Sequence, residues 1–161
     1  MTIAEYNQTV DTCADGLFRF IVKNLRNEEQ SRDIVQDTFA KLWMKVDEVS
    51  YDKSKSYLFT TGYRTMIDWI RREKKRGEIE KTELTAPEVR NDYSDLQAIL
   101  HEALNRLPEK QKHVVMLRDY EGYSYEEIGE ITDLSLAQVK VYIYRARVAL
   151  KTFLVSIDNL I

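Results

Sequence analysis

The 161-residue chain has few of the residues that cross-link or sharply bend a small protein: one cysteine, two prolines and five glycines. A single cysteine excludes a disulfide within the chain and is typical of a reducing compartment. Because Cys13 falls among apolar residues of a helical pattern, we expect it to be a small core residue. So few glycines and prolines argue against a fold rich in loops or β-turns.

Long apolar runs are missing as well. The longest uninterrupted aliphatic run is Val114–Leu117, far shorter than the roughly 20 residues that span a membrane. The first residues, MTIAEYNQ, contain Glu5 and no apolar stretch, so they do not form a secretory signal. We therefore expect a cytoplasmic protein with no membrane insertion.

The residue patterns of common enzymes are also missing. The two histidines, His101 and His113, have no cysteine or histidine partner at the spacing of metal ligands. The chain has neither a glycine loop that would cradle phosphate nor a nucleophile elbow. These observations predict a protein that is not an enzyme and that holds no metal or cofactor.

Apolar residues recur at helical intervals through nearly the whole chain, which predicts an all-α fold. We expect helices over residues 3–24 and 31–49, a polar loop over 50–56, and a third helix ending in the basic stretch 71–76. The periodicity is then lost over residues 77–95, whose net charge is about −4 by counting. It restarts at Leu96, with Pro108 opening a later helix. The sequence thus predicts two small helical domains, residues 1–76 and 96–161, joined by an acidic linker, residues 77–95.

Two stretches in the second half have the form of capping boxes, in which a serine and a Glu or Gln three residues later cap a helix start. They are Ser124–Glu127 and Ser135–Gln138, and they predict a short helix followed by a long one. Asp133, between them, tolerates a left-handed backbone. Gly129 is small where the two helices would cross closely. This pattern predicts a helix-turn-helix.

Charge is sorted sharply between these two helices. Residues 135–151 contain four cations and no carboxylate, whereas residues 124–131 contain three glutamates and no cation. A basic helix of roughly 25 Å suits the major groove of DNA. The alternative is a helix pair that binds nothing, because cations near a helix C-terminus also complement the helix dipole. That alternative explains Arg147 and Lys151, but it does not explain Lys140.

The basic stretch 71–76 also has two interpretations. Most runs of charge are solvated helix faces, but aromatic residues lie close by in this sequence. Cations mixed with aromatic rings suit unstacked bases of single-stranded nucleic acid. Aromatics at helical spacing usually form core, as we expect for Trp69, so Tyr51 and Tyr57 beside the polar loop are the better candidates for exposure.

Three segments, in this order, resemble bacterial RNA polymerase sigma factors. DIVQDTFAKLW (33–43) and YLFTTGYRTMIDWIRREKKR (57–76) resemble the sigma-2 region, and LNRLPEKQKHVVMLRDYEGYSYEEIGEITDLSLAQVKVYIYRARVALK (104–151) resembles the sigma-4 region. The short linker and the lack of further domains are similar to the extracytoplasmic-function (ECF) group. The resemblance covers about residues 10–152.

This resemblance implies a non-enzymatic initiation factor that binds core RNA polymerase, directs it to specific promoters and helps to melt promoter DNA. The acidic linker would run towards the RNA exit path. Whether an anti-sigma factor also binds stays open. The polymerase contact implied by the resemblance is the polar face of the second helix, with Phe39 and Trp43 partly in the core: Asp33, Gln36, Asp37 and Lys41.

The resemblance also implies two sets of DNA-binding residues. The set for the minus-ten element lies in and after the polar loop: Tyr51, Tyr57, Arg64, Arg71, Arg72, Lys74, Lys75 and Arg76. The set for the minus-thirty-five element lies mostly on the long helix of the helix-turn-helix: Arg118, Ser135, Ala137, Gln138, Lys140, Val141, Tyr144 and Arg145.

Three positions depart from the family pattern. Arg64 stands where asparagine is frequent, and Asp133 replaces the usual turn glycine. Val141 replaces a small polar residue, which favours an apolar contact such as one with a thymine methyl group.

Two rival functions fit a helix-turn-helix: a stand-alone repressor or activator, which would need dimer symmetry, and a helical interaction module that does not touch DNA. Co-elution with core polymerase and promoter-specific initiation discriminate between these and a sigma factor.

Overall fold

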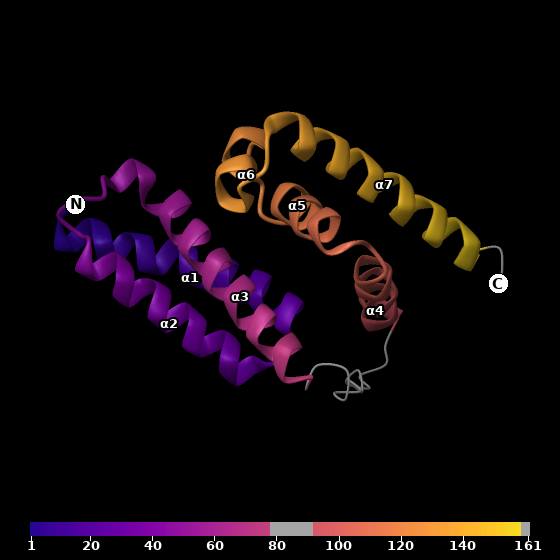
Figure 1. Cartoon of the computed structure of the whole chain (residues 1–161), viewed down its shortest axis with the longest axis horizontal. Helices are drawn as coiled ribbons and strands as arrows, with labels where there is room; N and C mark the ends of the chain where they lie inside the picture. The colour runs from indigo at the N-terminus through magenta and orange to yellow at the C-terminus, as the bar shows by residue number, and fades with distance from the viewer. Residues whose placement is uncertain (78–91, 159–161) are drawn as a thin grey trace. The chain divides into compact units, whose positions relative to one another are not determined.

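The structure, a computed structural model, describes residues 1–77 and 92–158 (Figure 1). These residues are helical, as expected, and form two compact units. The first unit contains α1 (Ile3–Leu25), α2 (Glu28–Met44), the short 3-10 helix η1 (Tyr51–Lys53) and α3 (Ser54–Arg76). The second contains α4 (Asp92–Asn105), α5 (Glu109–Asp119), α6 (Tyr125–Thr132) and α7 (Leu136–Asp158). Most of the expected acidic linker, residues 78–91, lies outside the described residues.

The first unit is a bundle in which α1, α2 and α3 each pack on the other two. Apolar residues three or four positions apart form one stripe on each helix and meet in a shared core. The stripes are fully buried: Leu17, Phe20 and Ile21 on α1, Leu42 on α2, and Leu58 and Met66 on α3. Cys13 is buried among them, as the sequence predicts.

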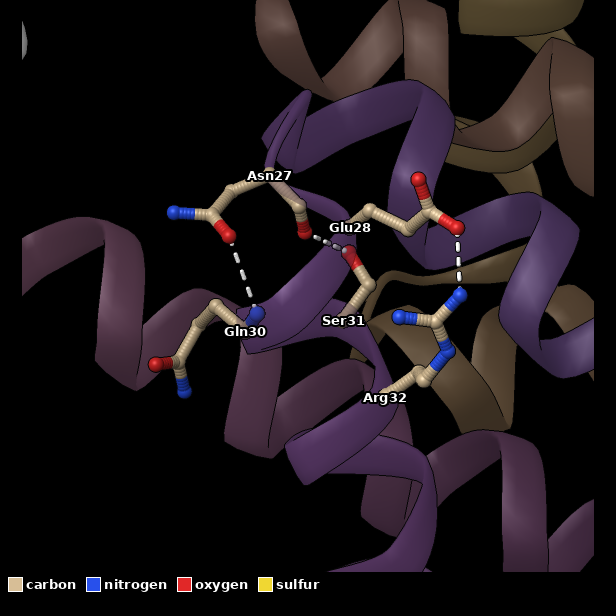
Figure 2. Close-up of polar contacts among 5 residues, drawn as sticks. All are labelled: Asn27, Glu28, Gln30, Ser31 and Arg32. Carbon is tan, nitrogen blue, oxygen red and sulfur yellow. Dashed lines mark hydrogen bonds and ion pairs between the residues drawn. The ribbon is translucent and has the colours of Figure 1, made fainter.

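The second helix begins and ends earlier than expected. Asn27 caps α2 by accepting a hydrogen bond from the Gln30 N–H at 2.9 Å (Figure 2). The Ser31 hydroxyl donates to the Asn27 carbonyl at 2.6 Å, and Glu28 pairs with Arg32 one turn later. The expected start at Ser31 is wrong because this cap precedes the first apolar residue of the stripe. The expected end at residue 49 is also wrong, since turns follow Met44.

The expected polar loop over residues 50–56 is wrong too. Residues 51–53 form η1, and α3 begins at Ser54. The buried Ser54 hydroxyl donates to the Tyr51 carbonyl at 2.7 Å and hydrogen-bonds with the Thr9 hydroxyl at 3.1 Å. These bonds satisfy polar groups inside the unit and fix the start of α3 against α1.

In the second unit, α7 packs on α5, and α4 contacts both helices. Three helices contribute fully buried side chains to its core: Val114 and Leu117 on α5, Ile128 on α6, and Val139 and Ala146 on α7. Helix α4 begins at Asp92, four residues before the expected start, and Pro108 is the N-cap of α5 instead of its first helical residue.

Candidate nucleic-acid and polymerase interfaces

Both expected capping boxes are present in the helix-turn-helix. The Ser124 hydroxyl accepts from the Glu127 N–H at 3.1 Å, and the Glu127 carboxylate accepts from the Ser124 N–H at 2.9 Å. Ser135 and Gln138 exchange the equivalent bonds at 3.1 and 3.0 Å. These bonds satisfy backbone donors that a helix start leaves unpaired, so they define where α6 and α7 begin.

The turn between α6 and α7 is tight. Asp133 ends α6 in the left-handed conformation, with φ 60°, as the sequence predicts. The Leu134 N–H then donates to the Gly129 carbonyl at 3.1 Å. A Cβ atom on Gly129 would lie 2.9 Å from the Leu134 carbonyl oxygen, a distance that side chains essentially never show. Glycine therefore lets the turn fold back on α6.

Helix α7 has one buried face and one exposed face. Val139, Ile143 and Ala146 are buried in the unit. On the opposite side, the large apolar side chains open to solvent include Val141, Tyr144 and Val148, which are 42%, 70% and 47% exposed. Five expected DNA-binding residues, Ser135, Ala137, Gln138, Lys140 and Arg145, are exposed as well. Within the described residues, Lys140 and Arg145 make no ion pair.

Arg147, in contrast, is paired with Asp119 of α5, although both side chains are partly exposed. Its guanidinium donates to both carboxylate oxygens, at 2.6 and 3.2 Å. These hydrogen bonds raise the pKa of Arg147. A bidentate pair of this kind fixes orientation as well as distance, so it ties α7 to α5.

Arg118 is also engaged locally. It donates to the Tyr123 carbonyl at 2.9 Å, and its guanidinium lies 5.0 Å from the centre of the Tyr125 ring. The side chain remains exposed, although it is anchored beside the start of α6. Arg118 thus belongs to α5, whereas the other residues of its expected set belong to α7 and its cap.

The polar face of α2 is exposed at all four expected positions: Asp33, Gln36, Asp37 and Lys41. Lys41 pairs with Asp37 one turn earlier, at 3.2 Å, and donates to the Thr65 hydroxyl of α3 at 3.4 Å. Spacings of three and four residues put these side chains on one side of the helix. The face is therefore a continuous polar strip.

Large apolar groups continue this surface at the end of α2. Phe39 is buried, and Trp43 is 47% exposed, which agrees with the expectation that it lies only partly in the core; Met44 is 82% exposed. The Trp43 ring meets Tyr6 of α1 edge to face, with centroids 5.0 Å apart. Tyr6 donates to the Phe39 carbonyl at 3.0 Å, and burial raises the pKa of its hydroxyl. Trp43 is therefore supported on one side and open on the other.

The basic end of α3 is exposed at all five cations, Arg71, Arg72, Lys74, Lys75 and Arg76. Arg71 lies 3.7 Å from Asp68 and Arg76 lies 3.2 Å from Glu73, so part of the charge is balanced within the helix. Tyr51 and Arg64 are exposed and Tyr57 is half-buried. The neighbouring aromatics Phe59 and Tyr63 belong to the core.

Helix α4 and the C-terminal half of α7 line an open groove of about 710 Å³. Its lining is mostly aliphatic, with Leu96, Ile99, Leu100, Leu150, Leu154, Val155 and Ile157, and it also includes Arg147 and Lys151. The sequence reasoning missed this groove, because both walls look like ordinary core stripes until their packing is known.

Residues 1–77 and 92–158 contain no group of three or more His, Cys, Asp or Glu side chains that would hold a metal ion. In the same part of the chain, no helix has the length and apolar character needed to cross a membrane. His113 is buried, and burial together with the Lys112 charge lowers its pKa to about 3. It is therefore a neutral core histidine at ordinary pH.

Comparison with known proteins matches both halves of the chain. Residues 9–76 match Sigma-70 region 2, and residues 97–150 match Sigma-70 region 4. The chain is 33% identical over 132 residues to RNA polymerase sigma factor SigV of Bacillus subtilis, which covers 80% of this chain and 78% of that protein. It is 31% identical over 144 residues to YlaC of the same organism, covering 84% and 83%. The chain belongs to the sigma-70 family, in its ECF group.

Two solved structures share the fold. The sigma factor RpoE of Bartonella quintana, in complex with the anti-sigma factor NepR, aligns with a TM-score of 0.76 and 23% identity over 94% of this chain and 98% of that one. CnrH, in complex with the cytosolic domain of CnrY, aligns with a TM-score of 0.71 and 24% identity, covering 94% and 88%. As an ECF sigma factor, the chain is a transcription initiation factor that directs RNA polymerase to specific promoters.

Two further features of this sigma factor escaped the sequence reasoning. The exposure of Met44 was not predicted; the signal for it was its place directly after Trp43, which turns its side chain to another side of the helix. The Asp119–Arg147 pair escaped because its partners are 28 residues apart and no local pattern links them.

Proposed function

We propose that the two units divide promoter recognition between them. The first, residues 1–76, binds core polymerase through α2 and opens the minus-ten element; the second, residues 96–161, binds the minus-thirty-five element through α7. The linker, residues 77–95, joins them. The chain acts in the cytoplasm by binding, with no catalysis of its own. The observation that carries this proposal is the exposed face of α7 over residues 136–151, which contain no carboxylate.

On the second unit, α7 enters the major groove with its N-terminal half. The helix start carries partial positive charge, which favours contact with phosphate. Arg118, anchored on α5, contacts the backbone beside the groove. The residues of α7 and its cap that face DNA are Ser135, Ala137, Gln138, Lys140, Val141, Tyr144 and Arg145.

On the first unit, the basic end of α3 follows the DNA backbone while exposed groups near its start hold a base that has left the stack. Tyr51 is the better placed of the two tyrosines, because Tyr57 is half-buried. The minus-ten set is Tyr51, Tyr57, Arg64, Arg71, Arg72, Lys74, Lys75 and Arg76.

The polar strip of α2, Asp33, Gln36, Asp37 and Lys41, docks on core polymerase, and the exposed half of Trp43 extends the contact. Aromatic rings held rigidly at a surface are strong anchors for a protein partner. The apolar groove between α4 and α7 supports a second protein contact, with polymerase or with an anti-sigma factor such as the one bound to RpoE of Bartonella quintana.

The polymerase contact is tested by reversing one charge on the strip. Asp37→Arg replaces an exposed carboxylate and should weaken binding to core polymerase while the helical content stays the same. Asp11→Arg makes the same change at an exposed position of α1 and should leave the affinity unchanged. Equal affinities for both variants and the wild type would remove α2 as the dock.

The DNA contact is tested with the holoenzyme. Lys140→Ala and Arg145→Ala should weaken promoter binding, and each lost phosphate contact should lower the salt slope by about one. Lys110→Ala removes an exposed cation from α5 and serves as the control. Wild-type promoter affinity and salt slope in both α7 variants would refute insertion of this helix.

A further inference from the structure

The centre of the exposed face of α7 is apolar, which is unexpected for a helix side that faces water. Val139, Ile143 and Ala146 mark the buried face. At about 100° per residue, Val141 lies roughly 190° around the helix from the middle of that face. It points directly away from the rest of the second unit and is 42% exposed.

Cations flank this valine on both sides. By the same rotation, Lys140 lies about 100° to one side of Val141 and Arg145 about 40° to the other. Both are exposed. A helix in the major groove needs this arrangement, because the phosphates form the two walls and the base edges form the floor. Val141 is therefore the side chain aimed at the floor.

The position of Val141 along α7 also suits a base contact. Helix-turn-helix proteins contact base edges with the first residues of the recognition helix. Val141 lies roughly 7.5 Å from the start of α7, and Val148 roughly 18 Å. The major groove is about 12 Å wide, so when the start of α7 lies at one wall of the groove, Val141 lies over the base edges and Val148 lies outside them.

Among the groups on the floor of the major groove, only the C5-methyl of thymine is apolar. A valine cannot form a hydrogen bond through its side chain, so it gains nothing from the donors and acceptors of the other bases. We propose that Val141 reads a thymine methyl group in the minus-thirty-five element. This inference rests on the proposed function, since it requires α7 to lie in that groove.

The test is a double-mutant cycle in which one change removes the methyl group from the DNA and the other removes the valine side chain from the protein. The minus-thirty-five element is first defined by selecting random duplexes with the holoenzyme. Each thymine of the selected element is then replaced, one at a time, by deoxyuridine, which lacks only the methyl group. Holoenzyme affinity is measured for the wild type, Val141→Ala and Val148→Ala; the last removes the same side chain two turns later and is the matched control.

At one thymine, deoxyuridine should weaken binding by the wild type about fourfold, the effect of one buried methyl group. Val141→Ala should weaken binding to the thymine duplex and should show no further loss with deoxyuridine at that position. Val148→Ala should retain the full fourfold effect. Helical content should not fall, because alanine favours helix more than valine does.

Three results would overturn the inference and leave the proposed function intact. The selected element could contain no thymine, or Val141→Ala and each deoxyuridine replacement could weaken DNA binding independently of one another. The third such result is a Val141→Ala defect that appears only in binding to a protein partner. If Lys140→Ala and Arg145→Ala also bind promoters as the wild type does, the proposed function itself fails.

Discussion

Replacing Gly129 by alanine tests whether the helix-turn-helix is held by the close approach of its turn to α6. Within a helix, Gly→Ala ordinarily stabilises by about 1 kcal/mol. Here the new Cβ would lie 2.9 Å from the Leu134 carbonyl oxygen. That oxygen belongs to the backbone of the turn, so it moves only if the turn moves.

The turn resists such movement because the same two residues are already linked. The Leu134 N–H donates to the Gly129 carbonyl at 3.1 Å, and Asp133 before it has a left-handed backbone. Overpacking of this kind typically costs 1–3 kcal/mol. Setting it against the helix propensity, we expect Gly129→Ala to lower the free energy of unfolding of the second unit by about 1 kcal/mol.

The chain offers a clean assay, because both of its tryptophans, Trp43 and Trp69, are in the first unit. Tryptophan fluorescence during urea unfolding therefore reports that unit alone, while circular dichroism reports the helices of both. Gly129→Ala should shift the dichroism midpoint down by roughly 0.5–1 M urea and leave the fluorescence midpoint unchanged.

Gly62→Ala is the matched control. Its Cβ would also lie 2.9 Å from a neighbour, but that neighbour is Cδ1 of Leu17, the end of a side chain in the first unit. A midpoint change should then appear in fluorescence. If Gly129→Ala instead stabilises the protein by the full helix-propensity gain, the turn relaxes freely and the reasoning is wrong.

Three further changes follow from the packing. Trp43→Ala should lower the free energy of unfolding by about 1–2 kcal/mol, less than the 3–5 kcal/mol of a fully buried aromatic, because nearly half the side chain is exposed. Urea unfolding followed by circular dichroism measures this loss, and a loss as large as that of Leu42→Ala would contradict the prediction. The pKa of His113 is lowered to about 3 in the folded chain, so between pH 3 and pH 6.5 only the unfolded chain gains the proton. The free energy of unfolding should therefore fall as the pH drops through this window, by up to about 1.4 kcal/mol per pH unit. His113→Gln should flatten this dependence of stability on pH. Asp119→Asn and Arg147→Met should show a coupling free energy of less than about 1 kcal/mol in a double-mutant cycle, since both side chains are more than a third exposed. A larger coupling free energy would mean that solvent screens the pair less than its exposure implies.

The features predicted best from the sequence were those made by neighbours in the chain. Each capping box consists of two hydrogen bonds between residues three positions apart, so the pairs Ser124 with Glu127 and Ser135 with Gln138 could be recognised in the sequence. The left-handed turn at Asp133 is equally local. Local geometry of this kind does not depend on what packs against the helix, and for that reason the helix-turn-helix was predicted from sequence alone.

Helix boundaries away from such motifs were less predictable, because hydrophobic periodicity records only buried apolar side chains. Asn27 followed by Glu28 and Glu29 is a helix-start signal, but it precedes the apolar stripe, and so the start of α2 was placed too late. Ser54 was read as loop because it is polar. Its hydroxyl is nevertheless satisfied by Tyr51 and Thr9, which lie far apart in the sequence.

The charge sorting of the helix-turn-helix has two causes, and the structure separates them. Arg147 pairs with Asp119, so one of the four cations serves the packing of α7 on α5. A count of cations alone therefore overstates the preference for DNA. The exposed apolar stripe, which includes Val141 and Tyr144, supplies an independent signal, since apolar side chains gathered on a solvent-exposed helix face indicate a binding surface. Phosphate requires the cations and a base edge accepts the apolar groups, so the two signals together favour a groove more strongly than either does alone.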